Sequence, residues 1–146
     1  MLKNLHLANA LKLEFLTGGY SKLDKRWVCE ERAFYFTRLY YIYSGSAVLC
    51  CNGETITMTA GNMYLLPTNL PVSYHCPERM EQLFLHVTLT NPEGFDMLSL
   101  IPRICQIPCT QELLTQLKEL CYSEDYGQLM KFKTLISQNV VDCLLA

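Results

Sequence analysis

Residues 46–59 read SAVLCCNGETITMT and decide the fold class, because Asn52-Gly53 stands between an apolar run and an alternating one. Asn-Gly is the strongest short-range sign of a two-residue β-hairpin loop, since a type I′ turn needs positive φ at both central residues. Ser46–Cys51 before it and Glu54–Thr59 after it each have the length and composition of a strand. The stretch therefore predicts an antiparallel pair of strands.

Strand-like sequence continues on both sides of this hairpin. Leu11–Phe15 alternates apolar and charged residues, and Phe34–Tyr43 is rich in aromatic residues. Further short apolar runs, separated by glycines and prolines, are Met63–Leu66, Val72–Cys76 and Gln82–Thr90. Strands that recur at roughly 8–12-residue spacing predict a mainly β chain that forms a sandwich or a closed barrel.

From Thr110 onward the apolar spacing becomes helical. Thr110 is expected to cap a first helix and Ser123 a second one, since their hydroxyl oxygens can accept hydrogen bonds from free backbone N–H groups. The second helix reaches Ala146 without a stop signal, which indicates a piece of a longer protein. We expect one domain over residues 1–146, with a barrel at about 11–92, a connection at about 93–109 and helices at 110–146.

Composition excludes several classes of protein. The chain is 50% hydrophobic with a formal net charge of −2, so it can build a core but offers no basic face for nucleic acid. No apolar run has the length of a membrane span, so no membrane partner is expected. The eight cysteines, without an export signal, are expected to be reduced thiols in the cytoplasm. Cys105 and Cys109 lack the second ligand pair of a zinc site.

The strand motifs together resemble the cupin half-barrel of AraC-type transcription regulators. The residues that carry the resemblance are Tyr41-Ile42-Tyr43-Ser44-Gly45-Ser46, Asn52-Gly53-Glu54 and Ala60-Gly61-Asn62-Met63-Tyr64-Leu65-Leu66-Pro67. The resemblance covers roughly residues 15–146 and implies a cupin-like (double-stranded β-helix or jelly-roll) barrel followed by two helices.

The resemblance also implies a function. Proteins of this family bind a small molecule, often a sugar, inside the barrel, and form homodimers through their helices. They bind DNA through helix-turn-helix motifs that follow this domain. Residues 110–146 hold three lysines against five acidic residues, so we expect the DNA-binding part to lie outside this chain.

A metal-dependent enzyme is the alternative, because many cupins hold a metal with histidines and a glutamate. Such a site needs several imidazoles and a carboxylate that converge on one centre. This chain has only His6, His75 and His86, and none of them falls within residues 34–51, where paired ligands are expected. We therefore expect no metal, no cofactor and no catalytic residue, while a stand-alone cupin enzyme such as a sugar isomerase or a dioxygenase stays open.

Strand alternation indicates where a ligand would bind. In Gln82–Thr90 one face is purely apolar, while the other carries Phe84 and His86 and suits a cavity for a polar molecule. The resemblance places Tyr74, Phe84 and His86 in the effector site. The candidate ligand-binding residues are Trp27, Arg38, Tyr41, Tyr43, Tyr74, Phe84 and His86.

Several of these residues also have ordinary structural interpretations. Tyr41 and Tyr43 fit a half-buried strand, and Trp27 suits either a lid or simple packing. Arg38 suits either an anionic ligand or an exposed pair with Glu30 or Glu31.

The second helix carries the expected dimer interface. Its main apolar stripe consists of Leu129, Phe132, Ile136, Val140 and Leu144. That stripe could instead pack on the chain's own barrel. A second stripe of Met130, Leu135, Val141 and Leu145 would then face another subunit, because two apolar faces on one helix call for two neighbours.

Overall fold

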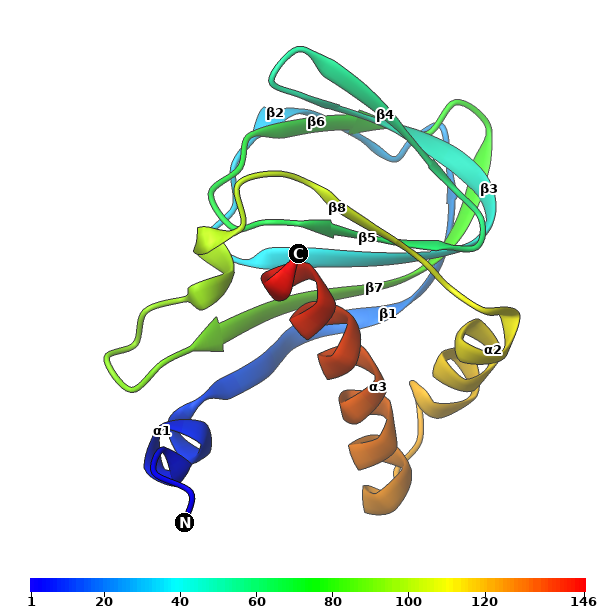
Figure 1. Ribbon diagram of the computed structural model, residues 1–146. Helices are drawn as coiled ribbons and strands as arrows, with labels where there is room; N and C mark the ends of the chain where they lie inside the picture. The colour runs from blue at the N-terminus through cyan, green and yellow to red at the C-terminus, as the bar shows by residue number, and fades with distance from the viewer.

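The computed structural model describes residues 1–146 as two antiparallel sheets with helices against one of them (Figure 1). In chain order the elements are α1 (Leu5–Ala10), β1 (Lys12–Asp24), β2 (Val28–Arg32), β3 (Thr37–Cys51), β4 (Glu54–Thr59), β5 (Asn62–Leu66), β6 (Val72–His75), β7 (Arg79–Thr90), η1 (Met97–Leu100, a 3₁₀ turn), β8 (Cys105–Pro108), α2 (Gln111–Leu120) and α3 (Tyr126–Leu145).

The strand β3 belongs to both sheets. Its first part pairs with β5 and β7 in the lower sheet, ordered β1-β7-β3-β5-β8, and Ser46–Cys51 pairs with β4 and β6 in the upper sheet. Gly45 lies where β3 passes from one sheet to the other and has a φ of 73°. A Cβ at Gly45 would collide with the Arg79 carbonyl of β7. Only glycine therefore fits this corner.

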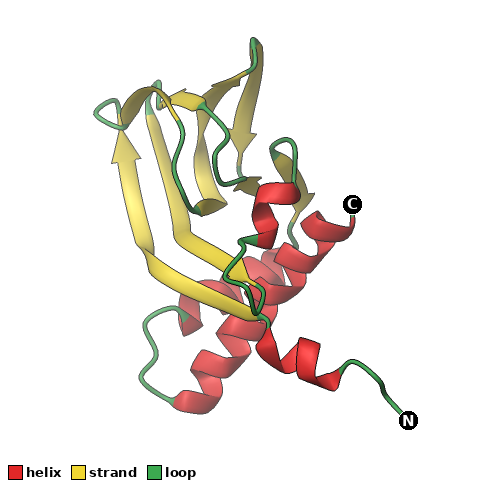
Figure 2. Cartoon of the chain, turned by 90° about the vertical axis from the view of Figure 1, so that its left-hand side faces the viewer, coloured by secondary structure: helices red, strands yellow, loops and turns green.

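The two sheets do not close into a barrel, which corrects the expected closure while the cupin-like fold stands. Figure 2 shows the sheets as two leaves that meet along β3 and diverge away from it. On the far side the chain passes from β5 to β6 through Pro67–Pro71 without strand pairing. Proline donates no backbone hydrogen bond, so the ladder ends there.

The predicted hairpin is confirmed between β3 and β4. Cys51 pairs with Glu54, and Asn52 and Gly53 have φ values of 51° and 77°. Both φ values are positive, as the Asn-Gly pattern requires.

The two predicted C-terminal helices are confirmed as α2 and α3, which lie against the outer face of the lower sheet (Figure 1). Thr110 caps α2 as expected, since its hydroxyl oxygen accepts from Leu113 N. Asp125, not Ser123, caps α3 and accepts from Gln128 N. Ser123 instead supports this cap, because its oxygen accepts from Asp125 N.

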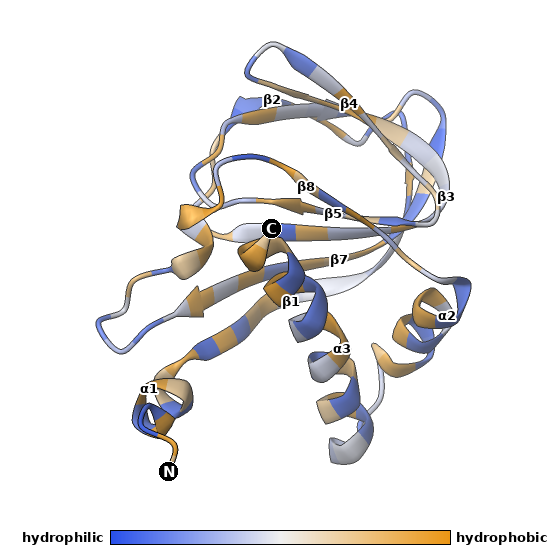
Figure 3. Ribbon diagram, viewed as in Figure 1, coloured by the Kyte–Doolittle hydropathy of each residue, from blue (hydrophilic) through white to orange (hydrophobic).

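The sheets divide the apolar residues into two cores. The outer core lies between the lower sheet and the helices, and the inner core lies between the two sheets. Hydropathy alternates along the lower-sheet strands, as two differently covered faces require (Figure 3). None of the helices combines the length and the hydropathy that a membrane-spanning helix needs.

Candidate ligand-binding site

The inner face of the lower sheet brings together the side chains expected on one face of β7 and one face of β3. Arg38 lies opposite His86, and Tyr40 lies opposite Phe84, in the β3–β7 register. Because side chains alternate along a strand, all four point into the space between the sheets. Arg38 and Tyr40 are almost fully buried, while Phe84 and His86 are half-buried.

Trp27 connects this group to the upper sheet. Its ring lies 4.0 Å from the ring of Tyr74 on β6 and 5.8 Å, edge-on, from the ring of Tyr40 on β3. Five of the predicted site residues, from four separate parts of the chain, therefore border one inter-sheet space. We call the set of Trp27, Arg38, Tyr74, Phe84 and His86 the inter-sheet group.

Apolar side chains fill most of the remaining inter-sheet space. Ile42, Leu49, Met58, Leu66 and Met80 are essentially inaccessible to solvent there. One more polar side chain lies on this face, because Gln82 of β7 is 2% exposed and its Oε1 has no hydrogen-bond partner.

Arg38 is buried without a partner, which corrects its expected exposure and pairing with Glu30 or Glu31. Its residue is 2% exposed, and neither Nε nor Nη1 has a hydrogen-bond partner. The chain's two ion pairs, Lys22–Glu81 and Arg26–Asp24, lie elsewhere. Arg38 is inaccessible because β3 turns this position inward and Phe34 covers it, with the guanidinium carbon 4.5 Å from the ring centroid.

Burial shapes the protonation of the neighbouring groups. It raises the pKa of Tyr40 to about 12, although the Arg38 charge opposes this shift. Burial also lowers the pKa of His86 below 6.5, and here the Arg38 charge acts in the same direction. The inter-sheet group therefore combines a fixed positive charge with a histidine that favours its neutral form.

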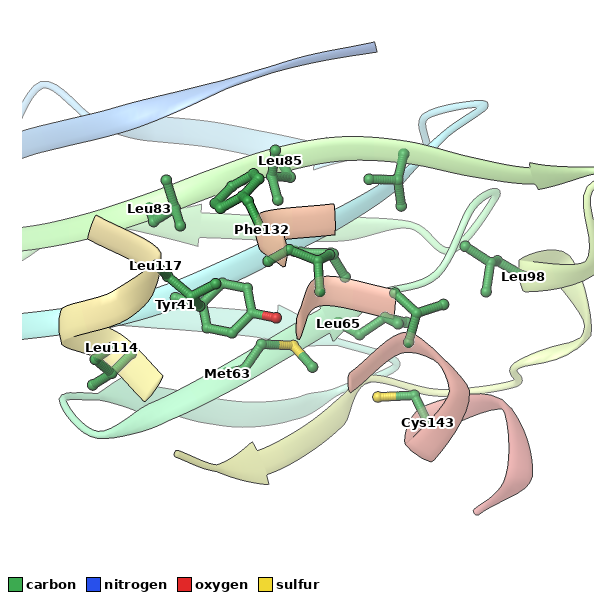
Figure 4. Close-up of a cluster of buried hydrophobic side chains, with 14 of the residues drawn as sticks. Tyr41, Met63, Leu65, Leu83, Leu85, Leu98, Leu114, Leu117, Phe132 and Cys143 are labelled. Atoms are coloured by element: carbon green, nitrogen blue, oxygen red, sulfur yellow. The ribbon is translucent and has the colours of Figure 1, made fainter. Parts of the chain in front are cut away.

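Tyr41 and Tyr43 lie on the opposite face of the sheet, so the structure does not bring them to the inter-sheet group. The Tyr41 hydroxyl donates to Asn139 Oδ1 of α3 at 2.6 Å, and the Tyr43 hydroxyl donates to the Leu114 carbonyl of α2 at 2.6 Å. Figure 4 shows Tyr41 within the outer core, surrounded by side chains from the sheet and the helices. Their odd positions on β3 place them there, because Arg38 and Tyr40 occupy the inward ones.

The α3 stripe that was expected to form the dimer interface packs largely against the chain's own core. Phe132, Ile136 and Val140 are buried in the outer core, and Leu129 and Leu144 are partly buried. This stripe therefore covers the sheet of its own chain. Of the second stripe, Leu135 also packs on the outer core, whereas three residues are exposed: Met130, Val141 and Leu145.

Comparison with protein families places the fold and this site in context. The family model of the AraC-binding-like domain matches residues 5–122, most of the chain. The chain belongs to this family. No curated protein matches the sequence significantly.

The AraC-binding-like domain described here is also similar to solved structures. ToxT from Vibrio cholerae has a TM-score of 0.58 and 14% identity, with 87% of this chain and 55% of ToxT covered. YhaK from Escherichia coli has a TM-score of 0.50 and 16% identity, with 75% and 48% covered. A cupin superfamily protein from Desulfitobacterium hafniense has a TM-score of 0.44 and 15% identity, with 54% and 78% covered. The chain spans about half the length of ToxT and of YhaK.

The histidines of this AraC-binding-like domain lie apart. His86 belongs to the inter-sheet group, His75 is exposed at the end of β6, and His6 is exposed on α1. No three side chains of His, Cys, Asp or Glu gather closely enough to hold a metal ion. His86 instead stacks on Phe36, with ring centroids 4.4 Å apart.

Sequence reasoning missed Phe34 and Phe36, which lie in the segment between β2 and β3. Phe34 covers the Arg38 guanidinium, and Phe36 stacks on His86. The aromatic triplet Phe34-Tyr35-Phe36 was the available signal, because aromatic residues directly before an inward-facing strand can fold over its end.

A separate hollow of about 390 Å³ lies on the helix side of the lower sheet. It is bordered by β1, β7 and the start of α3, and its lining is mostly apolar with Lys133 at its edge. None of the predicted ligand residues lines this hollow.

Proposed function

We propose that this AraC-binding-like domain is the effector-sensing part of a transcription regulator and that it binds a small molecule at the inter-sheet group. The observation that carries the proposal is Arg38, a buried cation that forms no ion pair and whose Nε and Nη1 have no hydrogen-bond partner, among half-buried aromatic rings. Buried polar groups in folded proteins are normally satisfied, and a ligand that pairs with Arg38 would explain this exception. A sugar, as the resemblance implies, is one candidate class of effector, since aromatic rings stack on the C–H face of sugars.

The location of the site suits a signal that passes to the helices. Arg38 and Tyr40 point between the sheets, while Tyr41 and Tyr43 of the same strand bond to α3 and α2. A ligand that shifts β3 therefore acts on strand and helices together. In this proposal the ligand favours one arrangement of the helices, and a DNA-binding part beyond this chain responds to it.

The proposed partners include a second copy of the chain. The exposed residues Met130, Val141 and Leu145 lie on the outward side of α3, so they are free to contact another subunit. A two-fold homodimer is the default symmetry for such a contact. All eight cysteines are unpaired thiols, which supports a reducing compartment such as the cytoplasm.

We propose a binding role and not catalysis. The alternative, a metal-dependent cupin enzyme, predicts stoichiometric iron, manganese or zinc in the purified protein. Metal analysis that found such a metal would favour the enzyme and contradict our proposal.

Trp27, the single tryptophan, gives a direct test of small-molecule binding. Because Trp27 stacks on Tyr74, a ligand at the inter-sheet group should change its fluorescence in a saturable way. A panel of sugars and small acids is titrated into the wild type and into Tyr74→Ala and His86→Ala variants. We expect at least one compound to saturate the wild type and to bind the folded variants about tenfold or more weakly, as loss of a ligand contact predicts. Equal affinity for both variants would remove these residues from the site.

A further inference from the structure

Arg38 has an unusual combination of burial, charge and missing partners. Its Nε and Nη1 atoms are buried and make no hydrogen bond, and no Asp or Glu forms an ion pair with it. Taking a guanidinium out of water without a counter-charge is costly, and the cost falls when an anion pairs with it. A guanidinium cannot escape this cost by losing its proton, because it stays charged at all ordinary pH values.

The contact with Phe34 leaves two donor atoms of Arg38, Nε and Nη1, buried without a hydrogen-bond partner. The guanidinium carbon of Arg38 lies over the Phe34 ring, 4.5 Å from its centroid, where a cation and an aromatic ring attract each other. The N–H donors of arginine lie in the plane of the group, at its edge. The Phe34 ring occupies none of the in-plane donor positions, so Nε and Nη1 keep their capacity to donate to a ligand.

The surroundings of Arg38 are positive and aromatic. Arg32 packs on the same Phe34 ring at 4.9 Å, so two guanidinium groups share one ring. His86 lies opposite Arg38 across the β3–β7 ladder, stacked on Phe36 and 5.6 Å from the Phe84 ring. These neighbours offer flat apolar surface and positive charge, and both ion pairs of the chain lie elsewhere.

We infer that Arg38 binds the carboxylate group of an organic anion, whose body packs against Phe84, His86 and the Phe34–Phe36 segment. The inference rests on the proposed function and names the ligand class for the same site. A carboxylate matches the edge of a guanidinium with two parallel hydrogen bonds and supplies the missing negative charge. Hydroxyl groups of a neutral sugar could accept hydrogen bonds, but they would leave the buried charge uncompensated.

A thermal-unfolding experiment with paired compounds tests this inference. Benzoate, hexanoate and glucuronate are compared at constant ionic strength with benzyl alcohol, hexanol and glucose, which share their carbon skeletons but carry no charge. We expect at least one carboxylate to raise the Tm of the wild type by about 4 °C at roughly ten times its Kd, and its neutral counterpart to have little effect.

Two variants assign the effect to Arg38. Arg38→Met keeps a long side chain without charge, Arg38→Gln serves if the first does not fold, and Arg103→Met removes an exposed arginine as the matched control. We expect the Arg38 variants to lose the carboxylate-dependent shift, Arg103→Met to keep it, and Arg38→Met without ligand to be at least as stable as the wild type.

Each remaining outcome overturns the inference. These outcomes are an unchanged carboxylate shift in the Arg38 variants, a neutral compound that shifts the Tm as much as its acid, and no shift with any carboxylate. A Tm shift with glucose alone would be compatible with the proposed sensing function and would contradict only the inference that the ligand is an anion. A flat response to all six compounds would count against both.

Discussion

At the scale of single residues, the alternation of β3 separates two roles. Inward residues such as Arg38 and Tyr40 form the candidate site, whereas outward residues such as Tyr41 fasten the strand to the helices. Tyr41 is fully buried, and burial raises its pKa well above 10.0, so it remains a hydrogen-bond donor at all ordinary pH values.

The Tyr41 hydroxyl should contribute measurably to stability. Tyr41→Phe removes the 2.6 Å hydrogen bond from the Tyr41 hydroxyl and leaves the side-chain Oδ1 of Asn139 buried without this donor. We expect a loss of about 1–3 kcal/mol in the free energy of unfolding, measured by urea denaturation. Tyr35→Phe is the control, because Tyr35 is 81% exposed, and it should leave stability unchanged. Equal stability of Tyr41→Phe and the wild type would contradict this role.

His86 should make stability depend on pH. Its pKa in the folded chain is lowered by burial and by the Arg38 charge, so the folded state prefers the neutral imidazole. The stability that neutral His86 contributes is fully present above pH 6.5, the pKa of His86 in the unfolded chain. It is lost as the pH falls from 6.5 through the pKa of His86 in the folded chain. Urea denaturation between about pH 7.5 and pH 5 should show this loss in the wild type and a smaller one in His86→Gln. Parallel pH profiles would contradict the assignment to His86.

At the scale of elements, the position that tolerates the fewest residue types is the corner of β3 at Gly45. Residues 34–43 and 46–51 were expected as separate strands divided by Gly45, but they form one strand that changes sheets there. A glycine between strand-like runs predicts a turn and a sheet-to-sheet corner equally well. The long-range pairing of β3 with β7 decides between a turn and a corner, and this pairing cannot be predicted from the residues around Gly45.

Gly45→Ala should therefore be much more destabilising than an ordinary turn substitution. Gly45 combines a φ of 73° with a collision between the new Cβ and the Arg79 carbonyl, so we expect a loss of about 3 kcal/mol or more. Gly53→Ala is the matched control, because its φ is 77° but its Cβ would meet nothing within 4 Å. It should cost about 1–2 kcal/mol by urea denaturation. Similar losses in both variants would show that the corner is not tightly packed.

At the scale of the whole molecule, the sequence predicted the local elements correctly, but it did not predict that the two sheets stay open instead of closing into a barrel. The Asn-Gly hairpin, the Thr110 cap and the helical stripes each depend on a few neighbouring residues, and the structure confirms these elements. Which α3 face covers the sheet and whether the sheets meet depend on residues far apart in the chain. The placement of Phe84 and His86 on one face of β7 was predictable, because alternation alone decides it. The cover of Arg38 by Phe34 was not, because it depends on the path of an irregular segment.

The exposed side of α3 should control the oligomeric state. We expect the wild type to sediment as a dimer at about 50 µM, where weak interfaces still associate. The double variant Met130→Glu, Leu145→Glu should be a folded monomer, because it places charges on exposed apolar positions that the outer core does not use. Leu16→Glu, on β1 at 49% exposure, should remain dimeric. A monomeric wild type would contradict the proposed interface.

The central claim is that a small molecule binds between the two sheets, and amide chemical-shift mapping of the ¹⁵N-labelled chain tests it most directly. With the carboxylates and sugars named above, we predict saturable shifts concentrated in residues 34–40 and 84–86. Shifts concentrated instead around Phe15–Gly19 and Lys133, which line the helix-side hollow, would contradict the claim.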